Sequence, residues 1–297
     1  MCIKPWYHSK YEVMIPCGGC VGCRVDRAIL WRNRAKSELI LKGRSAFVTF
    51  TYDTEHLHFS QVGPDMTLCR DDVHKFLDNL RHQVVKVPGS RRDFSYFLCG
   101  EYGGQFQRPH YHALFFGLDF YDCSRLFDNL WSHGSVKSLP VQAGSIDYVT
   151  DYVSKRYDGS LAVEMYDSRG VERPFCSVSR GFGASWIYSH RDDINRTGAI
   201  VIGSRYVQVP TYYRNVCKTM RLDDVMSREI AELERYQDKC RRVNALGFDD
   251  VRHYDDVSRR AKYDILSHAL TRDGEPFDRA YGIDDDTFGE YVMSSEV

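Results

Sequence analysis

The sequence predicts an α+β fold, in which an antiparallel sheet carries helices on one face. Two observations predict it. Short segments with alternating apolar residues recur at 47–52, 94–100 and 108–117, as expected of strands. Segments with apolar residues at helical spacing, such as 70–85 and 145–156, lie between and after them. Together they give the order strand, helix, strand, strand, helix, strand, which is typical of an α+β domain.

The individual elements follow from the local pattern. Gly103 and Gly104 turn strand 94–100 into strand 108–117, so these two strands are expected to pair antiparallel. Ser145, which follows Gly144, is the expected N-cap of the last helix. The remaining expected elements are a basic helix at about 25–41, a helix at 122–131 and a strand at 136–141. This order resembles that of an RRM-like or ferredoxin-like domain.

The 297 residues can hold one large domain or two modest ones. At 43% hydrophobic residues the chain can bury a core, which excludes wholesale disorder. We expect four parts: an N-terminal cysteine cluster with the basic helix at 1–42, the main domain at 43–160, a loop-rich extension with a hairpin at 161–220 that packs on the main domain, and a helical acidic tail at 221–297. Residues 157–198 are expected to be mostly loop, because they are rich in Gly, Ser and charged residues.

The net charge of −1 hides a split between the two ends of the chain. Residues 1–220 hold 28 Lys and Arg against 22 Asp and Glu, a net of +6, and residues 221–297 hold 12 against 19, a net of −7. The mildly basic front part is compatible with a local phosphate-binding groove. Because the N-terminus has no apolar run of signal-peptide length and no stretch reaches the length of a membrane span, we expect an intracellular protein with reduced cysteines.

The strand at 108–117 carries two histidines, His110 and His112. Side chains in a strand alternate between its faces, so both imidazoles project from one face and suit a divalent metal ion. Glu101 lies across the predicted turn and offers a carboxylate as third ligand, which favours Mg²⁺ or Mn²⁺. The alternative is a solvated glutamate beside two surface histidines. Other candidate ligands follow the first strand, namely Glu55, His56 and His58.

The helix at 145–156 places Tyr148, Tyr152 and Lys155 on one stripe. A phenol is a weak nucleophile at neutral pH, but beside a cation and a metal-polarised phosphodiester it can attack phosphorus. Lys155 would stabilise the phenolate or the charge of the transition state. The alternative is ordinary packing, since the chain contains 20 tyrosines.

A histidine pair followed by a tyrosine helix resembles the HUH endonucleases, and the likeness is greatest to the two-tyrosine, gokushovirus-type replication initiators of the Microviridae. The likeness extends over about residues 1–220 and includes 16–24, 47–52, 179–183 and 209–213. It implies an HUH endonuclease domain that nicks origin DNA in a metal-dependent reaction. One tyrosine would form a 5′-phosphotyrosine link, and the other would act later to release a circle.

Three cysteines near the N-terminus, Cys17, Cys20 and Cys23, have the spacing of zinc ligands, and Cys2 or His8 offers a fourth. The alternative is a turn with reduced thiols. The basic helix that follows either contacts DNA phosphates or forms a solvated amphipathic face.

The resemblance implies rolling-circle replication of a small phage genome in the cytoplasm of a bacterial host, with single-stranded and origin DNA as substrate. No phosphate-binding Gly-x-x-x-x-Gly-Lys-Ser/Thr motif occurs in the sequence, so unwinding is assigned to a host helicase and synthesis to a host polymerase. Two alternatives stay open. One is a non-catalytic RRM-like module that binds single-stranded nucleic acid. The other is a relaxase or transposase of the same HUH class.

Overall fold

The computed structural model describes residues 2, 5–10, 13–84, 94–104, 106–155, 157, 159–197, 199–202, 205–208, 212–213, 215 and 225–270. These residues form two compact units, one within 19–182 and the other within 1–18 and 183–277. The predicted domain boundaries after residues 42, 160 and 220 stay predictions. None of the helices in the described part of the chain combines the length and the apolar character that a membrane span needs.

The unit of residues 19–182 is built on a five-stranded sheet in which every neighbouring pair is antiparallel. The α+β class predicted from the sequence is therefore confirmed. The strand order is β8-β3-β7-β6-β9. These strands are β3 (Ser45–Tyr52), β6 (Ser95–Tyr102), β7 (Pro109–Phe116), β8 (Gly134–Leu139) and β9 (Phe175–Val178). In β3 buried and partly buried residues alternate, as the period of a strand requires.

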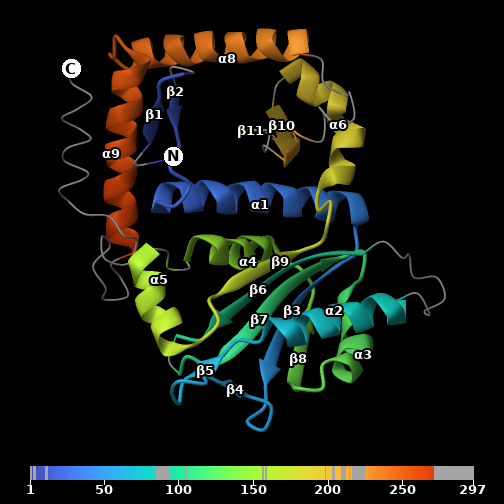
Figure 1. Cartoon of the computed structure of the whole chain (residues 1–297). Coiled ribbons are helices and arrows are strands. Elements are labelled where there is room, and N and C mark those ends of the chain that lie inside the picture. Colours follow the sequence, from blue (N-terminus) through green and yellow to red (C-terminus); the bar gives the residue numbers. More distant parts are fainter. Residues whose placement is uncertain are drawn as a thin grey trace. The chain divides into compact units, whose positions relative to one another are not determined.

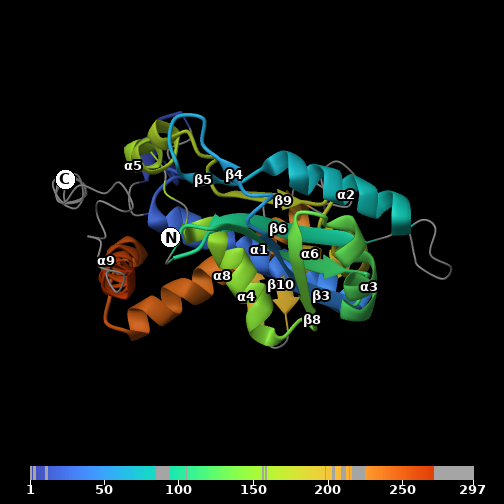
Figure 2. The same ribbon diagram turned by 90° about the horizontal axis from the view of Figure 1, so that it is seen from below.

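Helices cover both faces of this sheet, so the prediction of helices on one face is wrong. Figure 1 shows α1 (Val21–Lys42) and α4 (Ala143–Lys155) on one side, and α2 (Arg70–Val84) and α3 (Phe120–Leu130) on the other. Figure 2 gives the same elements from below. The physical reason lies in the central strands β6 and β7, which are buried along most of their length on both faces.

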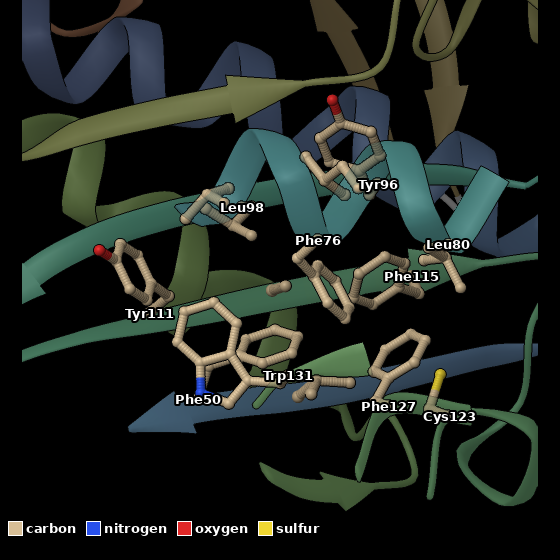
Figure 3. Packing of buried hydrophobic residues seen from close by; sticks show 14 of the residues in the cluster. Phe50, Phe76, Leu80, Tyr96, Leu98, Tyr111, Phe115, Cys123, Phe127 and Trp131 are labelled. Carbon is tan, nitrogen blue, oxygen red and sulfur yellow. The ribbon is translucent and has the colours of Figure 1, made fainter. Parts of the chain in front are cut away.

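The larger core lies between the sheet and α2 and α3. Figure 3 shows its aromatic centre, where the rings of Phe50, Phe76, Phe115, Phe127 and Trp131 pack together. Each of these rings is at most 2% exposed. Full burial of such a side chain stabilises a fold by about 1.5–3 kcal/mol, so this cluster fixes α2 and α3 on their face.

The opposite face carries the smaller core and leaves room for polar side chains at one end. Residues of α1 and α4, among them Ala28, Ala35, Ile146 and Val149, pack on Phe97 and other residues of the strands. α1 ends at Gly43, whose φ of 66° is a left-handed conformation typical of a helix C-terminus. The chain then enters β3 directly.

The prediction that residues 157–198 are mostly loop is also wrong. This span contains α5 (Gly159–Met165), a 3-10 turn (Asp167–Arg169), β9 and α6 (Ala184–Thr197). Tertiary contacts stabilise the segments that local composition does not predict. Ala162, Tyr166 and Val171 form a buried cluster, and β9 pairs with β6, far away in the sequence.

A small hairpin lies beside the large sheet, and the other unit has hairpins and helices of its own. The small hairpin pairs β4 (His58–Phe59) with β5 (Met66–Thr67). The other unit contains β1 (Trp6–His8), β2 (Val13–Ile15), β10 (Ala199–Ile202), β11 (Arg205–Gln208), α8 (Val225–Ala245) and α9 (Val251–Leu270). The hairpin and the two tail helices predicted from the sequence are thus present where they are described. Residues 203–204, 209–211, 221–224 and 271–297, to which those predictions also extended, lie outside the described residues.

Candidate functional site

The two histidines of β7 face the carboxylate of Glu101 on the neighbouring strand β6. The antiparallel register sets Glu101 directly opposite His110. The Nε2 atoms of His110 and His112 lie 2.8 Å and 3.0 Å from the same oxygen, Oε1 of Glu101. All three side chains are at most 20% exposed. This places two nitrogen donors and one carboxylate together on the α4 face of the sheet.

Each imidazole is oriented through its other nitrogen. Nδ1 of His110 lies 3.0 Å from the backbone carbonyl oxygen of Arg108, which can only accept, so Nδ1 carries the proton. Nδ1 of His112 lies 3.0 Å from Oγ1 of Thr49 on β3. Both arrangements leave Nε2 free to face Glu101 and to bind a cation. Sequence reasoning missed Thr49; its place on the same strand face as Phe47 and Thr51 was the available signal.

The donor set fits a divalent cation. Glu101, His110 and His112 each offer one ligand atom, and these atoms lie within 4.8 Å of one another. Burial alone would raise the pKa of the Glu101 carboxyl, but hydrogen bonds with His110, His112 and Tyr152 lower it to about 2. The carboxylate is therefore charged at neutral pH, as metal ligation requires.

The tyrosine helix α4 brings both phenols to this group. The Tyr148 hydroxyl lies 3.3 Å from Nε2 of His112, and the Tyr152 hydroxyl donates a hydrogen bond to that of Tyr148. The ring of Tyr152 stacks on the imidazole of His112, with centroids 5.7 Å apart. Two potential nucleophiles thus stand one helical turn apart beside the metal-ligand candidates.

Lys155 supplies a cation at the end of the same stripe. Its Nζ lies 4.8 Å from the ring centroid of Tyr152 and 5.8 Å from that of Tyr148. Burial raises the pKa of both phenols above the ordinary value, and Glu101 raises that of Tyr152 further. A phenolate here therefore needs positive charge nearby, which Lys155 and a bound cation can provide.

Ser145 does not cap this helix, contrary to the prediction. α4 begins at Ala143, and the Ser145 hydroxyl accepts a hydrogen bond from the backbone N–H of Gln142 at 3.0 Å. A serine in the first turn that reaches back to the residue before the helix acts like the third-position partner of a capping box. The helix therefore starts earlier than its sequence pattern indicated.

Ion pairs between α1 and α4 hold the tyrosine helix from its outer side. Arg32 of α1 lies 3.0 Å from Asp147 and 2.6 Å from Asp151, counted from its guanidinium nitrogens to carboxylate oxygens. Arg34, on the same helix, is buried and donates to the backbone oxygen of Phe182. These arginines serve the fold, so the expectation that the basic helix contacts phosphates does not hold for them.

The alternative metal ligands near the end of β3 lie elsewhere. His58 Nε2 is 2.6 Å from the buried carboxylate of Asp72, and His56 Nδ1 is 2.8 Å from Asp53. Glu55 is exposed. His58, Cys69 and Asp72 form a second group whose composition would allow metal binding. It adjoins Tyr52 and Tyr111, whose side chains belong to the core on the α2 face.

Comparison with known proteins gives a consistent result. A family model of phage replication-associated proteins of the ORF2 type matches residues 45–157, the span that contains both histidines and both tyrosines. The chain is 26% identical over 218 residues to replication-associated protein ORF2 of Spiroplasma virus 4, covering 67% of this chain and 66% of that protein. It is 26% identical over 251 residues to replication-associated protein VP4 of Bdellovibrio phage phiMH2K, covering 75% and 76%.

A third relative is replication-associated protein ORF4 of Chlamydia phage 1, 24% identical over 238 residues and matched over 73% of this chain and 57% of that protein. The chain belongs with these phage replication-associated proteins. The resemblance to gokushovirus-type proteins that the sequence indicated is thereby confirmed. No solved structure gives a significant match.

For a phage replication-associated protein, the N-terminal cysteines are a further feature to place. Cys2 and Cys17 belong to one unit, with their Sγ atoms 3.6 Å apart. Cys20 and Cys23 belong to the other unit, where both are buried at the start of α1. The zinc site predicted from their spacing stays a prediction.

Proposed function

We propose that this protein initiates rolling-circle replication of a small single-stranded DNA phage genome, by nicking and rejoining origin DNA through a 5′-phosphotyrosine intermediate. The observation that carries the proposal is the contact of two tyrosine hydroxyls, direct or through one another, with a group of two histidines and one carboxylate. The catalytic class is that of an HUH-type DNA endonuclease and strand transferase. The family relationship supports the same role.

Glu101, His110 and His112 would hold Mg²⁺ or Mn²⁺. A divalent cation at these residues supplies Lewis-acid polarisation of the scissile phosphodiester. The protein supplies the other components. Thr49 and the Arg108 carbonyl fix the two imidazoles, and α4 fixes the phenols beside them.

In the cleavage step, the oxygen of Tyr148 or Tyr152 attacks phosphorus. The new O–P bond joins the 5′-phosphate to the tyrosine, the bond from phosphorus to the 3′ oxygen breaks, and that oxygen leaves as a free 3′-hydroxyl after gaining a proton. The phenol loses its proton, and Lys155 stabilises the negative charge that develops beside it. The 3′-hydroxyl then primes a host polymerase.

Two tyrosines one turn apart suit two successive transfers. While one tyrosine carries the DNA, the other cleaves the regenerated origin, and the 3′-hydroxyl so formed attacks the first phosphotyrosine to close a circle. Unwinding is assigned to a host helicase, because the sequence contains no nucleotide-binding phosphate loop. The site of action is the cytoplasm of the bacterial host.

The test is covalent capture. The protein is incubated with Mg²⁺ or Mn²⁺ and single-stranded oligonucleotides that tile the phage genome, and adducts that survive SDS are digested and mapped by mass spectrometry. We expect DNA attached to Tyr148 or Tyr152 at one genomic position. Binding without an adduct would favour the non-catalytic single-stranded DNA-binding module. Cleavage of many unrelated sequences would favour a different enzyme of the same chemical class.

A further inference from the structure

A pocket of about 560 Å³ opens beside His110, at the end of the sheet where β3 stops and the β6–β7 hairpin turns. This volume lies within the range of roughly 300–1,000 Å³ that is typical of small-ligand sites. Its walls include Thr51 on β3, and Gly104, Phe106 and Arg108 on the hairpin loop. Because His110 lines the pocket and also faces Glu101, the pocket adjoins the candidate metal ligands.

The hairpin loop holds an aromatic ring in an exposed position at this pocket. Phe106 is 72% exposed, although a phenyl ring is ordinarily buried. The loop that carries it is closed by two backbone hydrogen bonds, from the Gly103 N–H to the Arg108 oxygen and from the Gln107 N–H to the Gly103 oxygen. Gln107 takes a left-handed φ of 50°, which is uncommon for a residue other than glycine. The fold thus fixes the loop around an exposed apolar side chain.

A cation stands next to this ring. One guanidinium nitrogen of Arg108, Nη2, donates to the backbone oxygen of Tyr52 at 2.8 Å, which fixes the side chain over the end of β3. Within the part of the chain that the structure describes, its other donors make no hydrogen bond or ion pair. They remain available to an anionic oxygen such as that of a DNA phosphate.

The wall opposite is bare backbone. A Cβ atom placed on Gly104 would meet no heavy atom within 4 Å. A flat ligand can therefore approach the loop closely. An exposed ring, an open backbone wall and an arginine are the features with which proteins hold an unstacked base and its phosphate.

We propose that this pocket binds a nucleotide that flanks the scissile phosphodiester, with its base stacked on Phe106 and its phosphate contacted by Arg108. The inference rests on the proposed function, because it takes the nicked strand as the ligand. Thr51 and His110 are register partners on adjacent strands, so their side chains leave the sheet on the same face. A strand whose phosphate lies at His110 therefore has its neighbouring nucleotide at the pocket.

The test uses the origin oligonucleotide that covalent capture identifies, with the fluorescent base 2-aminopurine placed in turn at the two positions on either side of the nick. Binding is measured with a chelator present, so that no cleavage occurs. Stacking on an aromatic ring quenches this base. We expect the wild-type protein to quench one flanking position, Phe106→Ala to lose that quenching, and Phe106→Trp to keep it. Tyr121→Ala, which removes an equally exposed ring on α3, should behave as the wild type.

Affinity provides a second measure. Phe106→Ala should weaken binding of the oligonucleotide roughly tenfold, as expected for the loss of one stacked base. Replacing the quenched nucleotide by an abasic one should weaken the wild type to a similar degree and the variant little further. Mn²⁺ titration without DNA should give the same affinity for both proteins.

The outcomes separate the two proposals. Wild-type protein that forms the tyrosine adduct, while Phe106→Ala retains both affinity and quenching, overturns this inference alone. Wild-type protein that forms no adduct with any genomic oligonucleotide overturns the proposed function and this inference with it.

Discussion

The chemistry proposed here depends first on how two imidazole rings are held. Both keep Nε2 directed at Glu101, because Nδ1 is fixed by the Arg108 carbonyl in His110 and contacts Thr49 in His112. A cation at this position would therefore find its ligands in place and lose little free energy to reorganisation.

Removing either imidazole should remove metal binding and nicking together. We expect His110→Ala and His112→Ala to lose Mn²⁺ binding in a calorimetric titration and adduct formation in gels, while single-stranded DNA binding persists. Glu101→Ala should weaken the metal titration. His82→Ala, which changes an exposed histidine of α2, is the matched control. Normal nicking by both variants would remove the metal assignment, and an unchanged titration of Glu101→Ala would place the third ligand elsewhere.

The two tyrosines should divide the work. Tyr148→Phe and Tyr152→Phe each remove one nucleophilic oxygen and keep the ring that packs beside His112. If the tyrosines alternate, each single variant cleaves a short origin strand and the double variant does not. Release of a circle fails in both singles, because it needs a second attack while the first adduct persists.

The readout is a cleavage gel beside a circle-release assay, with Tyr121→Phe as control. A Tyr148→Phe protein with full cleavage and full circle release would leave Tyr152 as the single nucleophile.

Asp72 is a buried carboxylate with a structural role, and its effect should depend on pH. Burial alone would raise the pKa of its carboxyl, but contacts with His58, Tyr52 and His133 lower it below the ordinary value. A group with a lowered folded pKa stabilises the fold above its unfolded pKa and loses that effect as the pH falls through the folded value. Asp72→Asn should therefore cost about 1–3 kcal/mol at pH 7 and progressively less in acid.

Urea unfolding at several pH values between neutral and acid measures this difference. Asp71→Asn, which changes an exposed neighbour, should change stability little at any pH. A loss for Asp72→Asn that stays constant into acid would show that the contribution is steric rather than electrostatic.

Sequence reasoning reached the residues whose neighbours are set by local periodicity. A period of two placed His110 and His112 on one face, and helical spacing placed Tyr148 near Tyr152. It did not reach Thr49, because the partner of a residue across two strands depends on the register. The rings of Phe47 and His112 are also stacked, at 5.7 Å between centroids, for the same nonlocal reason.

At the scale of elements, α1 has a different role from the one its composition indicated. Its arginines were expected to face DNA or solvent, yet Arg24 and Arg34 are at most 8% exposed, and Arg32 pairs with two aspartates of α4. The helix thus supports the tyrosine helix. The same pattern of basic and apolar residues fits both roles, so the sequence alone does not decide between them.

Loss of this support should slow cleavage without touching the metal ligands. Arg32→Ala removes both ion pairs to α4, which are partly exposed and each worth up to about 1 kcal/mol. Because small displacements of a reacting group can reduce a rate up to roughly a hundredfold, we expect single-turnover cleavage to fall by about tenfold or more. Arg32→Lys should recover part of the rate.

The Mn²⁺ affinity of Arg32→Ala should equal that of the wild type. Arg125→Ala serves as the control, since it also removes an arginine near an aspartate, but on α3. Cleavage at the wild-type rate would show that packing alone positions α4. A loss of metal affinity would show that the variant disturbs more than the helix.

At the scale of the whole molecule, the N-terminal cysteines lie where the chain passes from one compact unit to the other, between Gly18 and Gly19. Their spacing, with two residues between successive cysteines, led to the prediction of a structural zinc ion. Local spacing predicts such a site well, because ligands close in sequence need little further organisation. It does not predict which unit each ligand joins, since that depends on the rest of the chain.

A structural zinc ion would contribute directly to the stability of this segment. We therefore expect protein purified under reducing, chelator-free conditions to contain about one equivalent of zinc by elemental analysis. Removal of the metal should increase proteolysis in residues 1–42, because metal binding and local folding are coupled there. Cys20→Ser should lower the zinc content, whereas Cys176→Ser, in β9, should not. Metal-free protein with an unchanged digestion pattern would return Cys17, Cys20 and Cys23 to the role of ordinary reduced thiols, and the stability of the N-terminal segment would then rest on packing alone.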